Sequence, residues 1–262
     1  MGGKVVLSGR LAAAAAYVTN GNRVCDVGCD HGFVSIYLIQ QGISPGVLAM
    51  DVRKGPLMQA QSHIEEYGLA QYIETRLSDG LDAYQIGEAD TLICAGMGGR
   101  LMMHVLEAQP DKTASFQELI LQPQSEIQIF RRFLREQGYL IADENMIEED
   151  GKFYSIIYVA LGKKKKTLPI GESFAWENES EISLQAAIEP GTWQELEDLY
   201  GSILIRNRHP VLRRYLEREE QNFDGILEKL QAKGLEDIRR RERYQEIVRL
   251  RENCRSVLEM FN

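Results

Sequence analysis

The sequence contains little that would suit a membrane, disulfide-rich or metal-binding protein. No apolar run approaches the roughly 18 residues of a membrane-spanning helix. The stretch LAAAAAYV (residues 11–18) is too short and too weakly hydrophobic for a signal peptide, so we interpret it as a helix packed on the fold. Only four cysteines occur in 262 residues, and the spacing of Cys25 and Cys29 fits neither a zinc pair nor a redox motif. We expect a cytoplasmic protein with buried thiols, no metal and no membrane contact.

Positive charge is scarce over most of the chain. The formal net charge of −9 argues against a protein that coats nucleic acid through charge alone. The charge is uneven, because residues 205–255 hold 14 Lys and Arg against 10 Asp and Glu, a balance of +4 that leaves −13 for the remainder. This asymmetry favours an anionic partner for the C-terminal part.

The first part of the chain alternates short β-rich runs with segments of helical period. The expected strands are residues 24–27, 47–51, 72–77, 90–96 and 118–123, and the expected helices are 31–42, 55–68, 99–108 and 125–138. This rhythm predicts an α/β fold with a parallel sheet covered on both faces. Two further strand runs flank the turn EEDGK (residues 148–152) without a helix between them, so the sheet should end in an antiparallel hairpin. That architecture is typical of Rossmann-like class I methyltransferases, whereas a dehydrogenase has a sixth parallel strand.

The chain then changes character. The stretch KKKKTLPIGES (residues 163–173) is interpreted as a linker, which divides the chain into domains 1–162 and 163–262. Apolar residues recur at helical spacing over residues 210–262 and are interrupted at Gly234. This pattern predicts a C-terminal coiled-coil hairpin of two long helices. Residues 174–209 have no clear pattern.

The stretch VCDVGCDHGFVS (residues 24–35) reads as a strand, a turn and a helix. It has glycine at Gly28 and Gly32, but the third glycine of a dinucleotide-binding turn is missing, and Asp30 stands in its place. Ligands of such sheets bind at the carboxyl ends of the strands, where the strand order reverses. Carboxylates there would repel the pyrophosphate of a dinucleotide, so the loop predicts a ligand that carries positive charge.

Four predicted strand ends carry polar or glycine-rich residues. Asp26 suits a cationic group, Asp51 suits a ribose diol because it follows the glycine loop by about 20 to 25 positions, and Asp79 suits the amine of adenine. S-adenosylmethionine has no phosphate and carries a sulfonium and an ammonium group, so we expect it as the cofactor. Asp51 or Asp79 alone could equally be a turn or cap residue. The residues expected to bind the cofactor are Asp26, Gly28, Cys29, Gly32, Asp51, Val52, Ser78, Asp79, Gly80, Ala95, Gly96 and Met97.

Several motifs together resemble one family. They are LSGRL (7–11), DVGCDHGFVSIYL (26–38), RLSDGL (76–81), AGMGG (95–99), LILQPQ (119–124) and EDGKFYSIIY (149–158). They resemble the bacterial tRNA (adenine-22-N1)-methyltransferase family, often called TrmK, and the resemblance continues through YGSILIRNRHPVLRRYLE (200–217). Members of this family place a helical coiled-coil domain after a Rossmann-like methyltransferase domain. Two positions depart from the usual DHAYLP, because Phe33 replaces tyrosine and Ser35 replaces proline.

The resemblance implies methylation of adenine N1 in tRNA, at position 22. AGMGG lacks the polar-Pro-Pro-aromatic motif of methyltransferases that modify the exocyclic amine. N1 has its own lone pair, so positioning provides most of the catalysis, and the product is a cationic ring. We expect Asp30 to stabilise that charge, and His31 to hydrogen-bond the base or to orient Asp30. Alternatively, both residues only cap the helix that follows.

An adenine inside folded RNA must leave its stack to be methylated, which favours an aromatic platform. Phe33 and Tyr154 are candidates, although either could belong to the core. Arginines of the helical hairpin would contact the RNA backbone, or simply form a solvated face. The residues expected to contact the substrate are Arg10, Phe33, Gly98, Gly99, Gln122, Pro123, Tyr154, Arg206, Arg208 and Arg213.

Two alternatives remain open at this stage. The enzyme could methylate another RNA position or a small molecule. The chain could also be a non-catalytic, cofactor-sensing domain with a protein-docking helical arm. We expect a monomer or a weak dimer.

Overall fold

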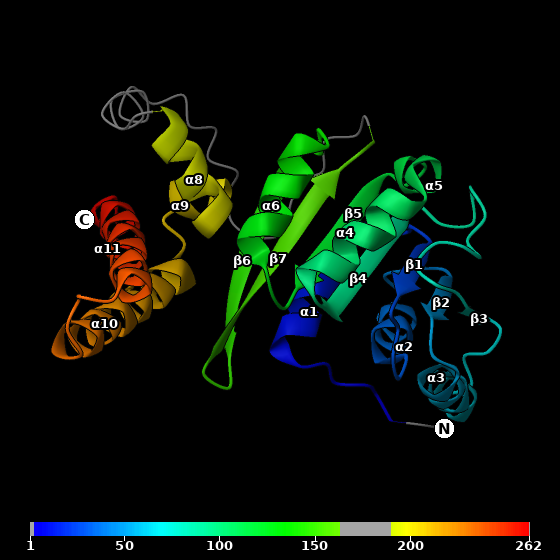
Figure 1. The fold of residues 1–262 in the computed structure, drawn as a ribbon. Helices are drawn as coiled ribbons and strands as arrows, with labels where there is room; N and C mark the ends of the chain where they lie inside the picture. The colour runs from blue at the N-terminus through cyan, green and yellow to red at the C-terminus, as the bar shows by residue number, and fades with distance from the viewer. Residues whose placement is uncertain (1–2, 163–189, 262) are drawn as a thin grey trace. The chain divides into compact units, whose positions relative to one another are not determined.

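The computed structural model describes residues 3–162 and 190–261 (Figure 1). The chain forms two compact units, Met1–Glu177 and Asn178–Asn262. The domain boundary predicted after residue 162 falls at the edge of the segment 163–189, and the predicted linker lies within that segment. Both predictions therefore concern residues outside the described ones.

The first unit contains a seven-stranded sheet in the order β3-β2-β1-β4-β5-β7-β6. Its parallel strands are β1 (Val24–Val27), β2 (Val47–Asp51), β3 (Ile73–Leu77), β4 (Thr91–Met97) and β5 (Glu118–Pro123). The last two strands, β6 (Ile141–Glu149) and β7 (Lys152–Ala160), pair antiparallel with each other, and β7 pairs antiparallel with β5. The predicted sheet and its closing hairpin are thus confirmed. The strand order reverses between β1 and β4.

Helices cover both faces of this sheet (Figure 1). One layer holds α1 (Gly9–Ala15), α2 (Phe33–Gln40) and α3 (Lys54–Glu66), and the other holds α4 (Gly99–Ala108) and α6 (Ile127–Glu136). The short helix α5 (Pro110–Ala114) was not expected from the sequence. The helix predicted within residues 11–18 is present as α1, where Ala14 and Ala15 are fully buried.

Burial on both faces explains why the central strands are mostly apolar. Successive side chains of a strand point to opposite faces, so Cys25 and Val27 join the apolar layer under α4 and α6, while Val24 joins the layer under α1, α2 and α3. By the same alternation, Asp26 lies on the face that α2 covers. The four cysteines are buried and free, as predicted.

The second unit is helical. Its described helices are α8 (Pro190–Tyr200), α9 (Ser202–Arg206), α10 (Pro210–Ala232) and α11 (Ile238–Glu259), and the sequence pattern predicted only the last two. Gly234, at φ 76°, follows the end of α10, and the side chain of Asp237 caps α11 by accepting a hydrogen bond from the Arg240 N–H. Ion pairs Arg251–Asp224 and Arg255–Glu220 link α11 to α10 in antiparallel order.

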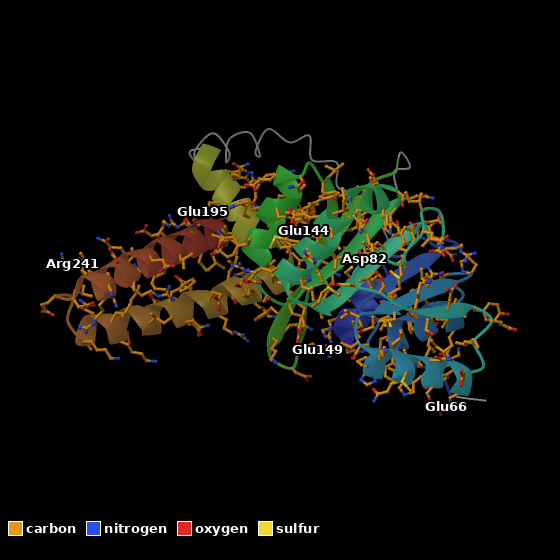
Figure 2. The ribbon with its side chains drawn as sticks, turned by 45° about the vertical axis from the view of Figure 1, so that its right-hand side comes forward. Glu66, Asp82, Glu144, Glu149, Glu195 and Arg241 are labelled. Atoms are coloured by element: carbon orange, nitrogen blue, oxygen red, sulfur yellow. The ribbon has the colours of Figure 1, made fainter. Side chains whose placement is uncertain are left out.

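Figure 2 marks Arg241 near the turn of this predicted hairpin.

None of the helices in the described part of the chain is both long and apolar enough to cross a membrane.

Candidate active site

A cavity of about 690 Å³ opens at the carboxyl ends of β1, β2, β3 and β4. This is the place where the strand order reverses, and where open α/β sheets bind their ligands. The residues predicted from the sequence that line it are Arg10, Asp26, Gly28, Cys29, Asp30, His31, Phe33, Asp51, Val52, Ser78, Asp79, Gly80, Ala95, Gly96 and Met97. Lining residues that the sequence analysis missed are Leu11, Val27, Val34, Arg53, Leu101 and Val105. Arg53 is the second residue after the end of β2 and directly follows Val52, the last residue predicted there, so extending that prediction by one residue would have found it.

The loop after β1 curls over the end of β2. The N–H groups of Gly28 and Cys29 both donate to the carbonyl oxygen of Met50, at 2.8 and 3.0 Å. Gly28 has φ 76°, and a Cβ there would lie 2.6 Å from the Met97 Cε, so no side chain fits at this point without a shift. Gly32 does not line the cavity. It has φ 74° and forms the N-cap of α2.

Asp26 is buried at the floor of the cavity and keeps a polar partner. The Ser35 hydroxyl donates to its Oδ2 at 2.7 Å. Burial raises the pKa of Asp26 to about 6, the hydrogen bond from the Ser35 side chain opposes this rise, and the nearby Asp51 adds to it. A ligand cation would favour the charged carboxylate and would itself be held by it.

Asp51 is buried as well, and the backbone holds its carboxylate in place. Its Oδ1 accepts the Arg53 N–H at 2.8 Å, and its Oδ2 accepts the Asp30 N–H at 3.2 Å. Each carboxylate oxygen has more than one lone pair, so both can still accept from a ligand hydroxyl. The exposed Arg53 guanidinium lies 3.7 Å from the Asp51 carboxylate.

Asp30 and His31 do not cap α2. The N-cap is Gly32, and no side chain hydrogen-bonds to the first turn, so the capping interpretation was wrong. The Asp30 side chain is 57% exposed, and its carboxylate lies 3.5 Å from the His31 Nε2 and 3.8 Å from the Arg53 guanidinium. A carboxylate at the mouth of the cavity, with two basic groups beside it, remains available to a substrate. Phe33, whose ring centre lies 6.1 Å from that of His31, is 38% exposed.

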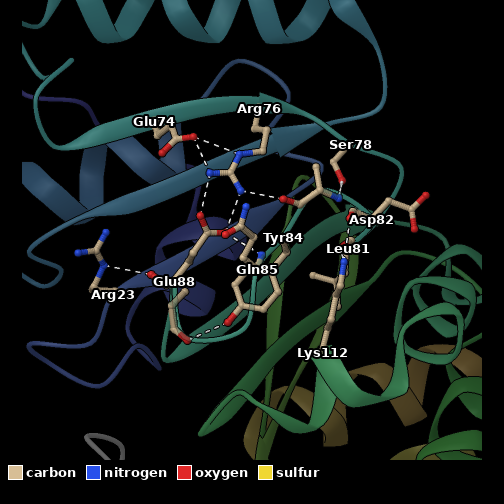
Figure 3. Close-up of polar contacts among 12 residues, drawn as sticks. Arg23, Glu74, Arg76, Ser78, Leu81, Asp82, Tyr84, Gln85, Glu88 and Lys112 are labelled. Atoms are coloured by element: carbon tan, nitrogen blue, oxygen red, sulfur yellow. Dashed lines mark hydrogen bonds and ion pairs between the residues drawn. The ribbon is translucent and has the colours of Figure 1, made fainter.

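Arg76 stabilises the loop that carries Asp79 through hydrogen bonds and ion pairs (Figure 3). Arg76 forms a two-pronged ion pair with Glu88, at 2.8 and 2.9 Å, and also donates to the Ala83 carbonyl at 2.8 Å. The pKa of Glu88 is lowered chiefly by the Arg76 hydrogen bonds. The Ser78 hydroxyl is used within the loop, because it donates to the Gly80 carbonyl and accepts the Ala83 N–H. Asp79 itself is exposed.

Three residues predicted to contact the substrate converge beside the cavity. Arg10 donates to the Gln122 Oε1 at 3.0 Å, and its guanidinium lies 5.5 Å from the centre of the Tyr154 ring. The same Gln122 oxygen accepts the Gly96 N–H at 3.1 Å, which ties this group to the end of β4. Glu149, at the end of β6 (Figure 2), pairs with Arg10 at 3.9 Å and was missed by the sequence analysis.

Gly98, Gly99 and Pro123, also predicted to contact the substrate, lie outside the cavity lining. Gly99 is buried, and a Cβ there would lie 2.7 Å from the carbonyl oxygen of Ser125. At Gly98 the nearest atom would be the Ser125 hydroxyl, at 3.0 Å. The start of α4 therefore packs closely against the loop after β5, and this close approach explains why Gly98 and Gly99 have no side chain. Pro123 is a buried residue of β5 that pairs with Met97.

The arginines predicted for the RNA arm have different surroundings. Arg206 pairs with Glu197 at 3.5 Å and Arg213 pairs with Glu217 at 3.0 Å, while Arg208 is exposed at φ 46°. The neighbouring His209 caps α10, because its Nδ1 accepts the Val211 N–H at 3.3 Å. Burial lowers the pKa of His209, so it is a neutral cap and adds no positive charge to the arm.

The strand order, the acidic loop after β1 and the cavity at the reversal point together define a class I methyltransferase. Residues 7–157 match the family model described as a methyltransferase domain. The tRNA (adenine(22)-N(1))-methyltransferase of Bacillus subtilis strain 168 is 32% identical over 224 residues, which cover 86% of this chain and 85% of that protein. The chain belongs to the TrmK family of tRNA (adenine-22-N1)-methyltransferases, as its motifs predicted.

Solved structures agree with this assignment. The crystal structure of the Bacillus subtilis m1A22 tRNA methyltransferase TrmK covers 97% of this chain and 100% of its own, with 28% identity and a TM-score of 0.77. A Streptococcus pneumoniae protein crystallised in complex with S-adenosyl-L-methionine covers 98% of this chain and 100% of its own, with 27% identity and a TM-score of 0.74.

Proposed function

We propose that this protein transfers a methyl group from S-adenosylmethionine to N1 of an adenine in tRNA, at position 22. The observation that carries the proposal is the cavity, where consecutive strand ends contribute Asp26, Asp51 and Asp79 and where Asp30 stands at the mouth. The substrate specificity follows the Bacillus subtilis relative, whose name specifies adenine 22. A dinucleotide is disfavoured, because its pyrophosphate would meet the carboxylates of the loop after β1.

The residues present fit S-adenosylmethionine. A cavity of about 690 Å³ lies within the usual range for small-molecule sites. The buried carboxylate of Asp26 suits a positively charged group, the backbone-held carboxylate of Asp51 suits a ribose diol, and Asp79 suits the adenine amine. When bound, this cofactor supplies an electrophilic methyl group on a sulfonium.

The protein has to orient the target adenine and to stabilise the charge that it acquires. N1 attacks through its own lone pair, so no strong base is required. The exposed carboxylate of Asp30 would interact more strongly with the developing cationic ring than with neutral adenine, which lowers the barrier. His31, 3.5 Å from that carboxylate, would orient it. Arg10, held by Gln122 and Tyr154, would contact the RNA beside the cavity.

The helical unit would bind the body of the tRNA. Exposed arginines such as Arg208 and Arg213 suit a phosphate backbone, which is recognised by charge and shape more than by sequence. The boundary between the catalytic and helical domains is proposed at residue 162. We further propose that the enzyme acts in the cytoplasm, as a monomer or weak dimer, without a metal.

The test is methyl transfer to defined RNA. The protein is incubated with S-adenosylmethionine carrying a labelled methyl group and with tRNA transcripts that have adenine or guanine at position 22. The modified nucleoside is then identified by mass spectrometry. We expect 1-methyladenosine only in transcripts with adenine 22. Labelling of another position or of another adenine atom would refute the assignment, and no transfer to any tRNA would refute the proposed activity.

A further inference from the structure

His63, in the last turn of α3, contacts the loop that carries Asp30 and His31. Its Nδ1 lies 3.0 Å from the carbonyl oxygen of His31. Its ring also stacks on Phe33, with the ring centres 4.8 Å apart and the planes at 21°. The His31 ring is 6.0 Å from the His63 ring and 6.1 Å from the Phe33 ring, so three aromatic rings cluster next to Asp30.

The chemistry of this contact fixes the proton on His63. A carbonyl oxygen can only accept, so the Nδ1 of His63 must carry the hydrogen. The bond therefore survives whether the imidazole is neutral or charged, since both forms keep the Nδ1 proton. His63 can serve as a constant tether for the loop, and its Nε2 takes no part in that contact.

The loop needs such a tether because its backbone is unusual on both sides of His31. Asp30 has φ 50° and Gly32 has φ 74°. A left-handed conformation is sparsely populated by residues other than glycine, although aspartate adopts it more readily than most, so we expect neighbouring contacts to stabilise it. The Asp30 N–H is held by Asp51, and the Gly32 N–H donates to the Cys29 carbonyl. The His63 Nδ1–H donates to the His31 carbonyl, which belongs to the same peptide group as the Gly32 N–H, so this peptide group is held at both its carbonyl and its N–H.

Burial does not fix these side chains. The side chain of His31 is 44% exposed and Phe33 is 38% exposed, so packing alone leaves them free to change rotamer. The His63 ring restricts the rotamers of Phe33 because it stacks on the Phe33 ring, and the hydrogen bond restricts the conformation of the His31 backbone. Both limits act on groups at the mouth of the cavity. The carboxylates expected to hold the cofactor have further anchors, the Ser35 hydroxyl for Asp26 and the Arg53 N–H for Asp51, and Asp51 also accepts the Asp30 N–H.

We propose that His63 is a positioning residue for the methylated adenine. It fixes the Asp30–His31 tip through the His31 carbonyl and completes, with Phe33, an aromatic platform for an extruded purine. This inference rests on the proposed function, because it assigns His63 to the recognition of that same RNA base. It adds a residue of α3 to a site otherwise built from strand ends and their loops.

Three substitutions separate the two contacts. His63→Ala removes both, His63→Asn keeps an amide donor near the position of Nδ1 but removes the ring, and His63→Phe keeps a ring but removes the donor. Ser62→Ala, on the neighbouring exposed position of α3, is the matched control. Thermal melts of all variants verify folding. Calorimetry gives the affinity for S-adenosylmethionine, and steady-state kinetics give kcat/KM for tRNA.

We expect His63→Ala to lower kcat/KM for tRNA by about 10-fold, the order expected for one hydrogen bond and one ring pair. Cofactor affinity should stay within about twofold of the parent, since no contact to that part of the cavity is lost. His63→Asn and His63→Phe should each recover part of the loss. A transcript with 2-aminopurine at the target position adds a second measurement, because its fluorescence on binding the parent should differ from that with His63→Ala.

Clear outcomes would overturn the inference. If the parent methylates tRNA and His63→Ala retains kcat/KM within twofold, His63 does not position the base. Recovery by neither His63→Asn nor His63→Phe would reject the two assigned contacts. A parallel loss of cofactor affinity in His63→Ala would make His63 a general structural residue. Absence of methylation by the parent rejects the proposed function instead, so the two failures are distinguishable.

Discussion

Replacing Ser35 with alanine removes one hydrogen bond from a buried carboxylate and should make cofactor binding depend on pH. The Ser35 Oγ–H donates to Asp26 at 2.7 Å, and the Ser35 backbone N–H also stabilises the charged carboxylate. Alanine keeps the backbone contact and loses only the hydroxyl. Ser35 is fully buried, so water cannot easily replace the lost donor.

The size of the effect follows from the Asp26 pKa. Burial places it at about 6 in the parent. A hydrogen bond to a charged group contributes roughly 1.5–3 kcal/mol, and one pKa step corresponds to about 1.4 kcal/mol, so Ser35→Ala should raise the pKa of Asp26 to between about 7 and 8. At pH 7 the parent carboxylate is then about 90% ionised and the variant roughly 10–50% ionised. If only the ionised form binds the ligand cation, affinity falls by about 2- to 10-fold at pH 7.

Calorimetric titration with S-adenosylmethionine from pH 6 to pH 9 tests this reasoning. Affinity should be lower in Ser35→Ala at pH 7 and should return to that of the parent at pH 9, where both carboxylates are ionised. Burial raises the pKa values of the nearby Cys29 and Cys94 thiols, so they stay protonated over this range. Asp26→Asn is the control, because it should bind weakly at every pH. A difference between Ser35→Ala and the parent that persists unchanged at pH 9 would refute a role through Asp26 ionisation.

Four other outcomes are expected. Asp26→Asn should be more stable than the parent by about 1–3 kcal/mol at pH 8 but not at pH 4. Burial raises the Asp26 pKa from 3.8 to about 6, so the stability of the parent falls as the pH rises through that window. Urea unfolding at both pH values measures the difference in stability between the two proteins, and an equal difference at pH 4 and pH 8 would contradict this reasoning. Asp51→Ala should weaken S-adenosylmethionine binding by more than about tenfold with the fold intact, and unchanged affinity by calorimetry would remove Asp51 from the pocket. Asp30→Asn should slow single-turnover methylation by about 10²- to 10³-fold with little change in cofactor affinity, and a rate within threefold of the parent would shift attention to His31. Replacing Arg206, Arg208 and Arg213 with glutamine should weaken tRNA binding and reduce its salt dependence, whereas Lys229→Gln should not, and an unchanged salt slope would show that these arginines form only a solvated face.

Part of this site could be read from the sequence because it depends on local rules. A strand run followed by Gly28, and another that ends in Asp51, are short-range patterns, and parallel strands bring their carboxyl ends to one edge of the sheet. Those two facts were sufficient to predict that Asp26, Asp51 and Asp79 share one cavity. The closing hairpin of β6 and β7 followed in the same way from strand runs and the turn between them.

Other features depend on contacts between residues that are distant in the sequence. The bond from His63 to the His31 carbonyl joins α3 to the loop before α2, and the pair between Glu149 and Arg10 joins the end of β6 to α1. Such contacts require the rotation of each helix about its axis and the register of each strand, which no local pattern specifies. The same holds for Gly99, whose requirement for glycine comes from the Ser125 backbone. The sequence by itself determined the fold class and the acidic character of the cavity, whereas only tertiary packing decided which side chains hold the acidic groups in place.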